Sequence, residues 1–262
     1  MHIKSMDNAF SLAGKNAIVT GGNKGIGLGI TTALASQGAN VAIFARDETS
    51  AREVIKDLGA KYNVRLSFYK TDISDMQSCK DSVDRCAADC KSIDILVNNA
   101  GAAFGGNLLD LEEDLSSWFK CFEVDLHGAV RMCYHVCKHM RDMGKGGRVI
   151  NITSNAGEIC NKPSLLSYAS AKAALNHFTR CFAAEVAEYG IRVNAIAPGF
   201  TFSNFSKNIP EEAYKMMCRE IPIGRFAEAV EIGALAAFLA GDASDAMTGA
   251  VLTMDGGYSL GH

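Results

Sequence analysis

The sequence predicts an α/β fold: a doubly wound parallel sheet with helices on both faces. Short β-rich runs alternate with longer amphipathic stretches from about residue 16 to the end. Several of these runs are continuously apolar, which is typical of strands covered on both faces. Repeated βα units imply right-handed crossovers and parallel strands. Because no linker, repeat or low-complexity stretch divides the chain, we expect a single domain over 1–262, with an N-terminal extension at 1–13.

Seven strands and six helices are expected in alternation. The expected strands are rich in apolar and β-branched residues and cover 16–20, 40–44, 64–70, 93–99, 147–153, 191–197 and 250–255. The expected helices lie between them, at 25–37, 48–60, 75–91, 111–143, 164–189 and 227–240.

The segment 198–223 is the least regular part of the chain, and we expect it to carry one or two short helices. Loops of this length in a compact domain are usually functional, so it is the expected substrate loop. Its apolar side chains fit two interpretations equally, a satellite cluster packed on the core and a flap over an apolar ligand. These side chains are Phe200, Phe202, Phe205, Met216 and Met217.

Composition excludes several classes of protein. A hydrophobic content of 48% and a net charge of −3 are ordinary for a soluble globule and give no reason to expect nucleic acid or an anionic membrane as partner. No apolar run approaches the ~18 residues of a spanning helix. The first residues lack the core of a signal peptide. Nine cysteines without CxxC or CxxC…HxxxH spacing predict reduced thiols, no metal site and a cytoplasmic location.

Tyr168 and Lys172 are the strongest candidates for chemistry. Residues four apart share a helix face, so the ammonium of Lys172 can lie below the phenol of Tyr168. A nearby cation favours the ionised form of a phenol, whose ordinary pKa is about 10. Such a tyrosine can exchange a proton near neutral pH, which suits the interconversion of an alcohol and a carbonyl. Ser154 precedes Tyr168 by fourteen residues, after an expected strand.

The same spacing occurs a second time, at Tyr134 and Lys138. This pair lies in the middle of an expected helix, with no polar strand end leading into it. We therefore interpret it as an ordinary helix face without chemistry.

A glycine-rich turn follows the first expected strand and precedes a helix. Glycines at 21, 25 and 27 allow a tight turn, close approach to a pyrophosphate and a helix N-terminus aimed at it. The spacing differs from the general G-x-G-x-x-G pattern. The order strand, turn and helix nevertheless favours a dinucleotide.

The second strand indicates which dinucleotide. An acidic residue near its end would accept from the ribose hydroxyls of NAD, and this chain has Ala45 followed by Arg46. Lys24 adds a cation inside the glycine turn. Two cations without that carboxylate suit a 2′-phosphate, so NADP(H) is predicted, although Asp47 lies next to them.

These residues together resemble the short-chain dehydrogenase/reductase family from about Gly14 to Tyr258. The motifs are TGGNKGIG at 20–27, Asp72 after the third strand, NNAG at 98–101, Ser154, YASAK at 168–172, PG at 198–199 and DGG at 255–257. The resemblance implies a single Rossmann-like sheet of seven strands with helices on both sides. It also implies a homotetramer.

The resemblance assigns expected roles by position. Tyr168 would be the general acid/base, Lys172 would lower its pKa and bond the nicotinamide ribose, and Ser154 would donate to the substrate oxygen. The expected cofactor contacts are Gly21, Asn23, Lys24, Gly25, Ile26, Gly27, Arg46, Asp72, Ile73, Asn98, Ala100, Gly101, Pro198, Gly199, Thr201 and Ser203, together with Tyr168 and Lys172.

Three departures from the family pattern stand out. Asp125 occupies a position where the family commonly has an Asn that supports a water-mediated proton relay to the lysine. The gap from Ser154 to Tyr168 is one residue longer than expected. Ser203 replaces a Thr that often contacts the carboxamide.

The expected function is that of an NADP(H)-dependent oxidoreductase acting on a secondary alcohol or its ketone, with a bulky apolar substrate such as a hydroxysteroid suggested by 200–217. Alternatives within enzymes are reduction of a 3-oxoacyl chain on a carrier protein, which would need a basic docking patch, and oxidation of sugar acids or polyols. Enoyl reduction would place the Tyr and Lys farther apart. A non-catalytic NADPH-binding sensor or scaffold is the alternative outside enzymes.

Overall fold

A seven-stranded parallel sheet forms the centre of the molecule. The computed structural model describes residues 8–102, 106–160, 163–202 and 209–261. The strands lie in the order β3-β2-β1-β4-β5-β6-β9, and each neighbouring pair is parallel. Their bounds are β1 Asn16–Thr20, β2 Asn40–Ala45, β3 Leu66–Lys70, β4 Ile95–Asn98, β5 Gly147–Ile152, β6 Ile191–Pro198 and β9 Val251–Met254. All seven expected strands are present, and the predicted fold class is confirmed.

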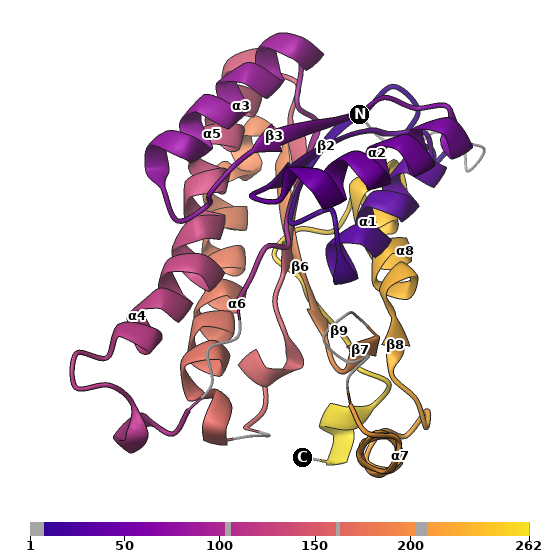
Figure 1. The fold of residues 1–262 in the computed structure, drawn as a ribbon. Helices are drawn as coiled ribbons and strands as arrows, with labels where there is room; N and C mark the ends of the chain where they lie inside the picture. The colour runs from indigo at the N-terminus through magenta and orange to yellow at the C-terminus, as the bar shows by residue number, and fades with distance from the viewer. Residues whose placement is uncertain (1–7, 103–105, 161–162, 203–208, 262) are drawn as a thin grey trace.

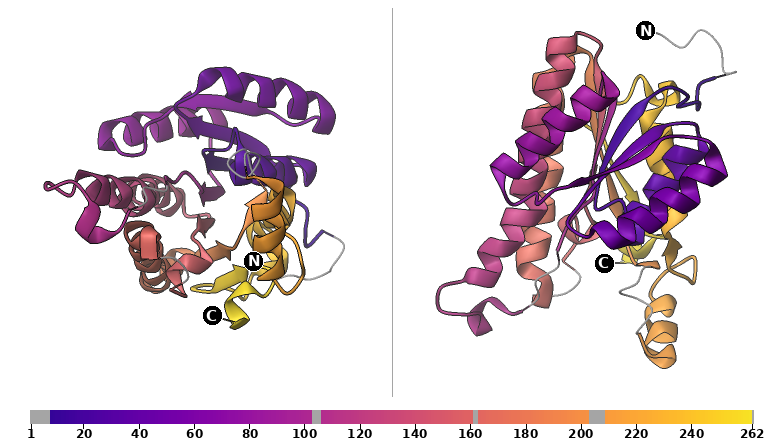
Figure 2. Two further views of the ribbon diagram at one scale, coloured as in Figure 1. Left: turned by 60° about the horizontal axis from the view of Figure 1, so that its bottom comes forward. Right: turned by 45° about the horizontal axis from the view of Figure 1, so that its top comes forward.

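Helices cover the two faces of this sheet (Figures 1 and 2). One layer contains α3 (Met76–Cys90), α4 (Ser116–Phe122), α5 (Gly128–Met143) and α6 (Leu166–Val186). The other contains α1 (Gly25–Ser36), α2 (Glu48–Tyr62) and α8 (Ala229–Ala240). Within the described ranges, no helix combines the length and apolar character needed to cross a membrane.

Local sequence explains where two of these helices begin and end. Asp47 caps α2 by accepting hydrogen bonds from the backbone N–H groups of Thr49 and Ser50. Asp75 caps α3 by accepting one from Ser78. A carboxylate at this position satisfies backbone donors that lack a partner in the first turn. Asn63 ends α2 in the left-handed conformation, a common way to terminate a helix.

The expected helix at 111–143 is wrong in its details. Residues 111–115 are not helical, α4 begins at Ser116, and a π-helical turn at Glu123–His127 separates α4 from α5. Helix period alone does not reveal an inserted residue, because a π turn keeps the helix axis nearly continuous.

The expected helix starting at 227 is also wrong at its first two residues. Ala227–Glu228 form β8, which pairs with β7 (Thr201–Phe202) in a small second sheet. Glu228 then caps α8 through a reciprocal arrangement with Glu231. This capping box fixes the helix start, and the pairing with residues far earlier in the chain is a tertiary effect.

Apolar side chains fill the space between the sheet and each helix layer. On the α1/α8 face, Ile30, Leu34 and Ile232 pack against the sheet with no exposed surface. On the α3/α5/α6 face, Met132 and Val136 do the same. Strand residues alternate between these two clusters, which explains why the strands read as continuous apolar runs.

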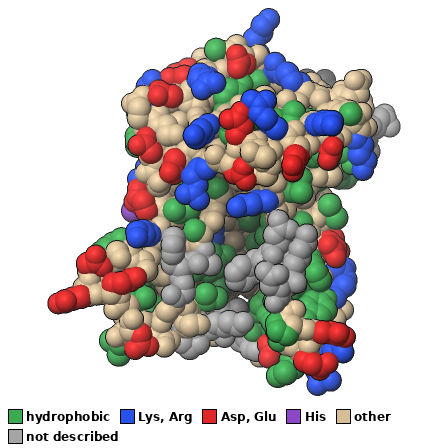
Figure 3. Space-filling model, viewed as in Figure 1, with side chains coloured by type: hydrophobic (Ala, Val, Ile, Leu, Met, Phe, Trp, Pro, Cys, Tyr) green, Lys and Arg blue, Asp and Glu red, His purple; other side chains and the backbone are tan. Residues whose placement is uncertain are grey.

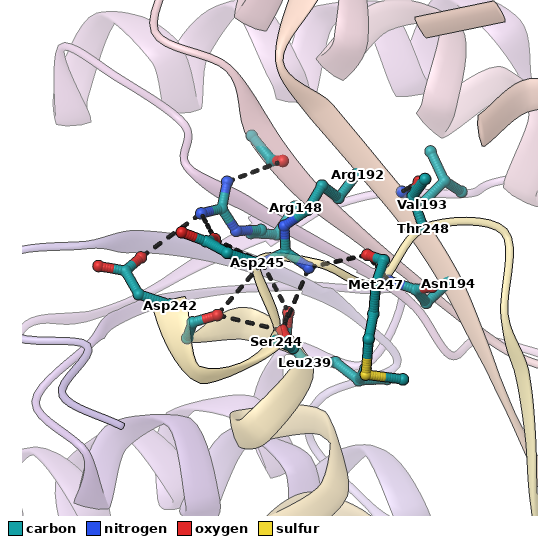
Figure 4. A network of polar contacts seen from close by, with 12 residues as sticks. Arg148, Arg192, Val193, Asn194, Leu239, Asp242, Ser244, Asp245, Met247 and Thr248 are labelled. Carbon is teal, nitrogen blue, oxygen red and sulfur yellow. Dashed lines mark hydrogen bonds and ion pairs between the residues drawn. The ribbon is translucent and has the colours of Figure 1, made fainter. Parts of the chain in front are cut away.

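Hydrogen bonds and ion pairs of Arg148 and Arg192 link the amino ends of β5 and β6 to the turn after α8 (Figure 4). Arg148 pairs with Asp245 at 2.7 Å and with Asp242 at 3.4 Å. Arg192 donates to the carbonyls of Gly241 and Met247 at 3.1 and 3.2 Å. Burial and the charge of Arg148 together lower the pKa of Arg192 to about 10, although Asp245 opposes both. These contacts lie at the end of the sheet opposite to the candidate site.

Candidate active site

A cleft of about 620 Å³ opens at the carboxyl edge of the sheet, between β1 and β4. At this point the strand order reverses, because β2 lies on one side of β1 and β4 on the other. Ligands of open α/β sheets bind at such a reversal, where loops on either side diverge. Figure 3 shows the hollow in the middle of this face, with Lys and Arg side chains above it.

The glycine turn forms one wall of the cleft. Gly21 adopts a φ of +65°, which favours glycine. A Cβ added at Gly27 would lie 2.1 Å from the carbonyl oxygen of Gly21, so no larger side chain fits. The turn is tied to the turn after β4, because Asn99 Nδ2 donates to the Thr20 carbonyl at 2.9 Å and the Ala100 N–H donates to Thr20 Oγ1 at 3.0 Å. The two turns therefore form one rigid surface.

Most of the predicted cofactor contacts line this cleft. They are Gly21, Asn23, Lys24, Gly25, Ile26, Gly27, Arg46, Asp72, Ile73, Ala100 and Gly101. These residues come from the turns after β1, β2, β3 and β4, which parallel strands bring to the same edge.

Other predicted contacts lie elsewhere. Asn98 does not line the cleft; its amide donates to Asn151 Oδ1 at 2.9 Å and links β4 to β5 in the interior. Pro198 ends β6, Gly199 follows it, and Thr201 begins β7. The Thr201 hydroxyl donates to the Gly199 carbonyl at 3.1 Å. Ser203 lies outside the described residues.

Asn99 of the expected NNAG turn also lines the cleft. Ser74, Ala102 and Val124 line it as well and were not predicted. Asn99 lies inside the NNAG motif, and Ser74 lies two residues after Asp72. Val124 had no sequence signal, because only the π turn places it next to the cleft. Among the described residues, no group of three or more His, Cys, Asp and Glu side chains is placed to hold a metal ion.

Two exposed cations border the end of the cleft that lies against β2. Lys24 and Arg46 are both exposed and both line the cleft. Asp47 lies beside them, but its carboxylate is committed to capping α2, and the hydrogen bond from Ser50 lowers its pKa. Asp72 accepts from the Ser74 hydroxyl, and this hydrogen bond lowers the pKa of Asp72. This end of the cleft therefore offers two cations to an anion.

Lys172 is buried where α6 meets the carboxyl ends of β4 and β5. Its Nζ donates to the Ile152 carbonyl at 3.1 Å and lies 3.0 Å from Asp125 Oδ1. The ammonium is 5.6 Å from the centre of the Tyr168 ring. Burial acts to lower the pKa of Lys172, but the charges of Asp125 and Tyr168 outweigh burial, so the pKa is raised. These neighbours therefore favour the charged form of Lys172 beside the ring of Tyr168.

Ser154 lies two residues beyond Ile152, at the end of β5. Its Oγ accepts a hydrogen bond from the Ala156 N–H at 3.2 Å and begins a short 3₁₀ turn. The next residue, Asn155, donates to Asp255 Oδ2 at 3.3 Å, which fastens this turn to the DGG motif. Gly157 packs against the backbone of Lys172, so the Ser154 turn rests on α6. The structure thus packs the turn that begins at Ser154 against the backbone of Lys172, and the ammonium of Lys172 lies between Asp125 and the ring of Tyr168.

The second Tyr–Lys pair does not share these features. Tyr134 is 57% exposed and stacks edge-on against His135, and Lys138 is exposed as well. Lys172 is 4% exposed. The same four-residue spacing therefore gives a buried lysine at Tyr168 and Lys172 and an exposed helix face at Tyr134 and Lys138.

The apolar side chains of the expected substrate loop pack mainly on one another. Phe200 stacks on Phe226 with ring centres 5.2 Å apart, and Tyr214 meets Phe226 edge-on at 4.8 Å. Phe202 and Met217 join this cluster, whereas Met216 is 65% exposed. Phe205 lies outside the described residues. Among the described residues of this segment, α7 (Glu211–Arg219) is the one α-helix. The packing supports a satellite cluster at the carboxyl edge of the sheet.

Comparison with known proteins gives the family. Residues 21–259 match a short-chain dehydrogenase/reductase family model that is described as enoyl-(acyl carrier protein) reductase. The chain belongs to the short-chain dehydrogenase/reductase family. The resemblance seen in its motifs is confirmed, and the chain is an oxidoreductase of this family.

Two curated short-chain relatives match over nearly the whole chain. A cis-4-hydroxycyclohexanecarboxylate dehydrogenase of Sinomonas cyclohexanicum is 36% identical, covering 97% of this chain and 99% of the relative. A 3-oxoacyl-(acyl-carrier-protein) reductase of Chlamydia muridarum is 34% identical, covering 95% and 98%. A solved structure of gluconate 5-dehydrogenase from Burkholderia cenocepacia, in complex with NADP and tartrate, superposes with a TM-score of 0.89 at 31% identity, covering 97% of this chain and 98% of that one.

Proposed function

We propose that this protein is an NADP(H)-dependent oxidoreductase that interconverts a secondary alcohol and its ketone. The observation that carries this proposal is the buried ammonium of Lys172, which lies 5.6 Å from the Tyr168 ring and contacts the strand end that carries Ser154. The cofactor cleft begins beside it, at Gly101 and Ala102. A proton-exchanging phenol next to a dinucleotide cleft suits carbonyl reduction.

Each of the three central groups has a distinct role. Tyr168 gives a proton to the substrate oxygen during reduction and takes it back during oxidation. Lys172 stabilises the ionised phenol through its charge. Ser154 donates a hydrogen bond to the substrate oxygen and holds it near the phenol. When bound, the nicotinamide supplies or accepts the hydride.

The residues of the cleft fit a phosphorylated dinucleotide. Gly21 and Gly27 have no side chain that would keep a pyrophosphate away from the backbone at the N-terminus of α1. Lys24 and Arg46 suit a 2′-phosphate, and the end of β2 offers Ala45 instead of a carboxylate. Asp47 is occupied as a helix cap, which weakens it as a ribose ligand. A family member of known structure was solved with NADP.

Removing both cations is expected to reverse the cofactor preference. In the variant Lys24→Ala/Arg46→Ala, the ratio of kcat/KM for NADPH over NADH should fall by about 100-fold, because each charge-assisted hydrogen bond to phosphate contributes about 1.5 kcal/mol and every 1.4 kcal/mol is about a factor of ten. Steady-state kinetics with the two cofactors measures this ratio. Lys56→Ala removes an exposed cation of α2 outside the cleft and should leave the ratio unchanged. A more than tenfold preference of the parent protein for NADH would contradict the assignment.

A free ketone with an apolar body is the proposed substrate. Residues 107–115 form an arm that follows Gly106, and the Gly106 N–H donates to the carbonyl of Ser164, four residues before Tyr168, at 2.8 Å. The arm is acidic, as Figure 3 shows, with Asp110, Glu112, Glu113 and Asp114 all exposed. An acidic arm does not supply the basic docking patch that a carrier-bound chain would need. The partly buried rings of Phe200, Phe202 and Tyr214 provide apolar surface at the same edge.

A screen of NADPH oxidation over a panel of carbonyl compounds tests the function. The panel contains bulky cyclic ketones, 3-oxoacyl thioesters and keto forms of sugar acids. We expect turnover with cyclic ketones, including hydroxysteroid precursors. Turnover with the keto forms of sugar acids alone would overturn the apolar substrate, and turnover with 3-oxoacyl thioesters alone would favour a reductase of fatty-acid chains. No turnover with any compound would favour a non-catalytic sensor.

The homotetramer and the cytoplasmic location expected from the sequence stay predictions. Phe119 and Tyr134 are 61% and 57% exposed on α4 and α5. Exposed aromatic rings of this kind are enriched at protein interfaces and support an oligomer. Light scattering of the purified protein measures its mass in solution.

A further inference from the structure

A buried carboxylate lies directly against the buried lysine of the site. Asp125 Oδ1 is 3.0 Å from Lys172 Nζ, and their side chains are 0% and 5% exposed. The second oxygen of Asp125 accepts hydrogen bonds from the Ala102 N–H at 3.2 Å and from the Cys121 thiol at 3.7 Å. Asp125 therefore contacts both the proposed cationic partner of Tyr168 and the turn that lines the cofactor cleft.

Local backbone geometry directs Asp125 to this point. It is the middle residue of the π-helical turn Glu123–His127, which inserts an extra residue between α4 and α5. Such turns often occur at functional sites, because the wider turn reorients a side chain. A Cβ added at Gly101 would lie 2.6 Å from Asp125 Oδ1 and 3.5 Å from Lys172 Nζ. The carboxylate, the ammonium and the cofactor-facing turn are thus in mutual contact.

We propose that Asp125 is a positioning residue that ties Lys172 to the cofactor-facing turn and, by cancelling part of the ammonium's charge, raises the pH at which Tyr168 exchanges its proton. This inference rests on the proposed roles of Tyr168 and Lys172. An asparagine at the same position would keep a hydrogen-bond acceptor for Ala102 but would leave the charge of Lys172 unopposed.

The charges around Lys172 set the direction of the effect. The groups that face it are the Asp125 carboxylate of the π turn, the Tyr168 phenol of α6, the Cys121 thiol of α4 and the Ile152 carbonyl of β5. A cation favours the phenolate of Tyr168, and an anion at 3.0 Å from that cation opposes it. Removing the anion lowers the pH at which the Tyr168–Lys172 pair releases its first proton, whichever of the two groups loses it.

Spectroscopic titration of Tyr168 tests the inference without turnover. Tyrosinate absorbance is recorded against pH for the parent and for Asp125→Asn, and the same curves for proteins that also carry Tyr168→Phe are subtracted. The midpoint assigned to Tyr168 should fall by about one pH unit in Asp125→Asn, as expected for a charge within a few ångströms. An unchanged or higher midpoint overturns the proposal.

Glu123→Gln is the matched control. It removes a carboxylate from the same π turn, but this group pairs with Arg131 and with His127, at 2.9 Å. Because Arg131 and His127 already pair with this carboxylate, and it is not among the groups that face Lys172, we expect an unchanged Tyr168 midpoint. If Glu123→Gln shifted the Tyr168 midpoint as much as Asp125→Asn does, the effect would not be specific to Asp125. This result would also overturn the proposal.

Kinetics separates the two parts of the role. Reduction needs a protonated Tyr168, so the rate falls as pH rises through its titration, and this fall should begin about one pH unit lower in Asp125→Asn. Asp125→Ala loses the acceptor for Ala102 as well and should raise KM for NADPH several-fold, which Asp125→Asn should not do. Equal KM values in both variants would remove the tethering role. Absence of turnover in the parent would refute the proposed function but leave the spectroscopic result to decide the inference.

Discussion

Tyr168→Phe is expected to lower the rate of ketone reduction by about 1,000-fold and to leave the affinity for NADPH within about twofold of that of the parent. The hydroxyl is the only group removed, and it is the proposed proton donor to the substrate oxygen. The ring stays in place, so Lys172 keeps its neighbour 5.6 Å away and its hydrogen bond to the Ile152 carbonyl. Steady-state rates and cofactor fluorescence titration measure the two quantities.

The chain contains a matched control for this substitution. Tyr134→Phe removes the same hydroxyl from a second tyrosine that has a lysine four residues later. Tyr134 is 57% exposed on α5 and does not line the cleft, so its variant should keep parental activity. If both variants were equally active, the catalytic assignment of Tyr168 would fail and a sensor or scaffold would be the better interpretation.

Lys172→Met is expected to lose both activity and stability. Its ammonium is the buried partner of Asp125, so the substitution leaves a carboxylate with 0% exposure beside an apolar side chain. Breaking a buried ion pair on one side typically costs about 3 to 5 kcal/mol, which is a large share of a protein's free energy of unfolding. Urea unfolding followed by circular dichroism measures this loss.

A double variant distinguishes the ion pair from simple loss of packing. Adding Asp125→Asn to Lys172→Met removes the unpaired charge, so part of the lost stability should return even though activity does not. Lys138→Met removes an exposed lysine from α5 and should change stability by less than about 0.5 kcal/mol. If the double variant were no more stable than Lys172→Met, the unpaired carboxylate of Asp125 would not be the cause of the lost free energy of unfolding.

The strands were predictable because their signal is local and strong. All seven expected runs form the sheet, with ends that differ by at most two residues from those expected, such as Leu66–Lys70 against 64–70. A strand buried on both faces must be apolar throughout, and the residues that follow it must turn. Most of the residues that line the cleft were therefore predictable as well, because the turns after parallel strands meet at one edge of the sheet.

Helix breaks and pairings between distant segments were not predictable. The π turn at Glu123–His127 leaves no mark on helical periodicity, and the pairing of β7 with β8 joins residues separated by more than twenty positions. Asn98 illustrates the same limit within a motif, because it belongs to NNAG yet donates to Asn151 inside the protein. Whether a side chain at the end of a strand faces the cleft or the interior depends on how the strands are arranged in the sheet.

By itself, the sequence determined the order of strands and helices, the glycine turn and the helical spacing of Tyr168 and Lys172, all of which depend on neighbours along the chain. Only the tertiary structure decided which of two identical Tyr–Lys spacings is buried and what lies against the lysine. Asp125 and Lys172 are far apart in sequence but 3.0 Å apart in space. Their charges interact strongly because the packing of α4, α6 and β5 excludes water from between them, and no local pattern records that exclusion.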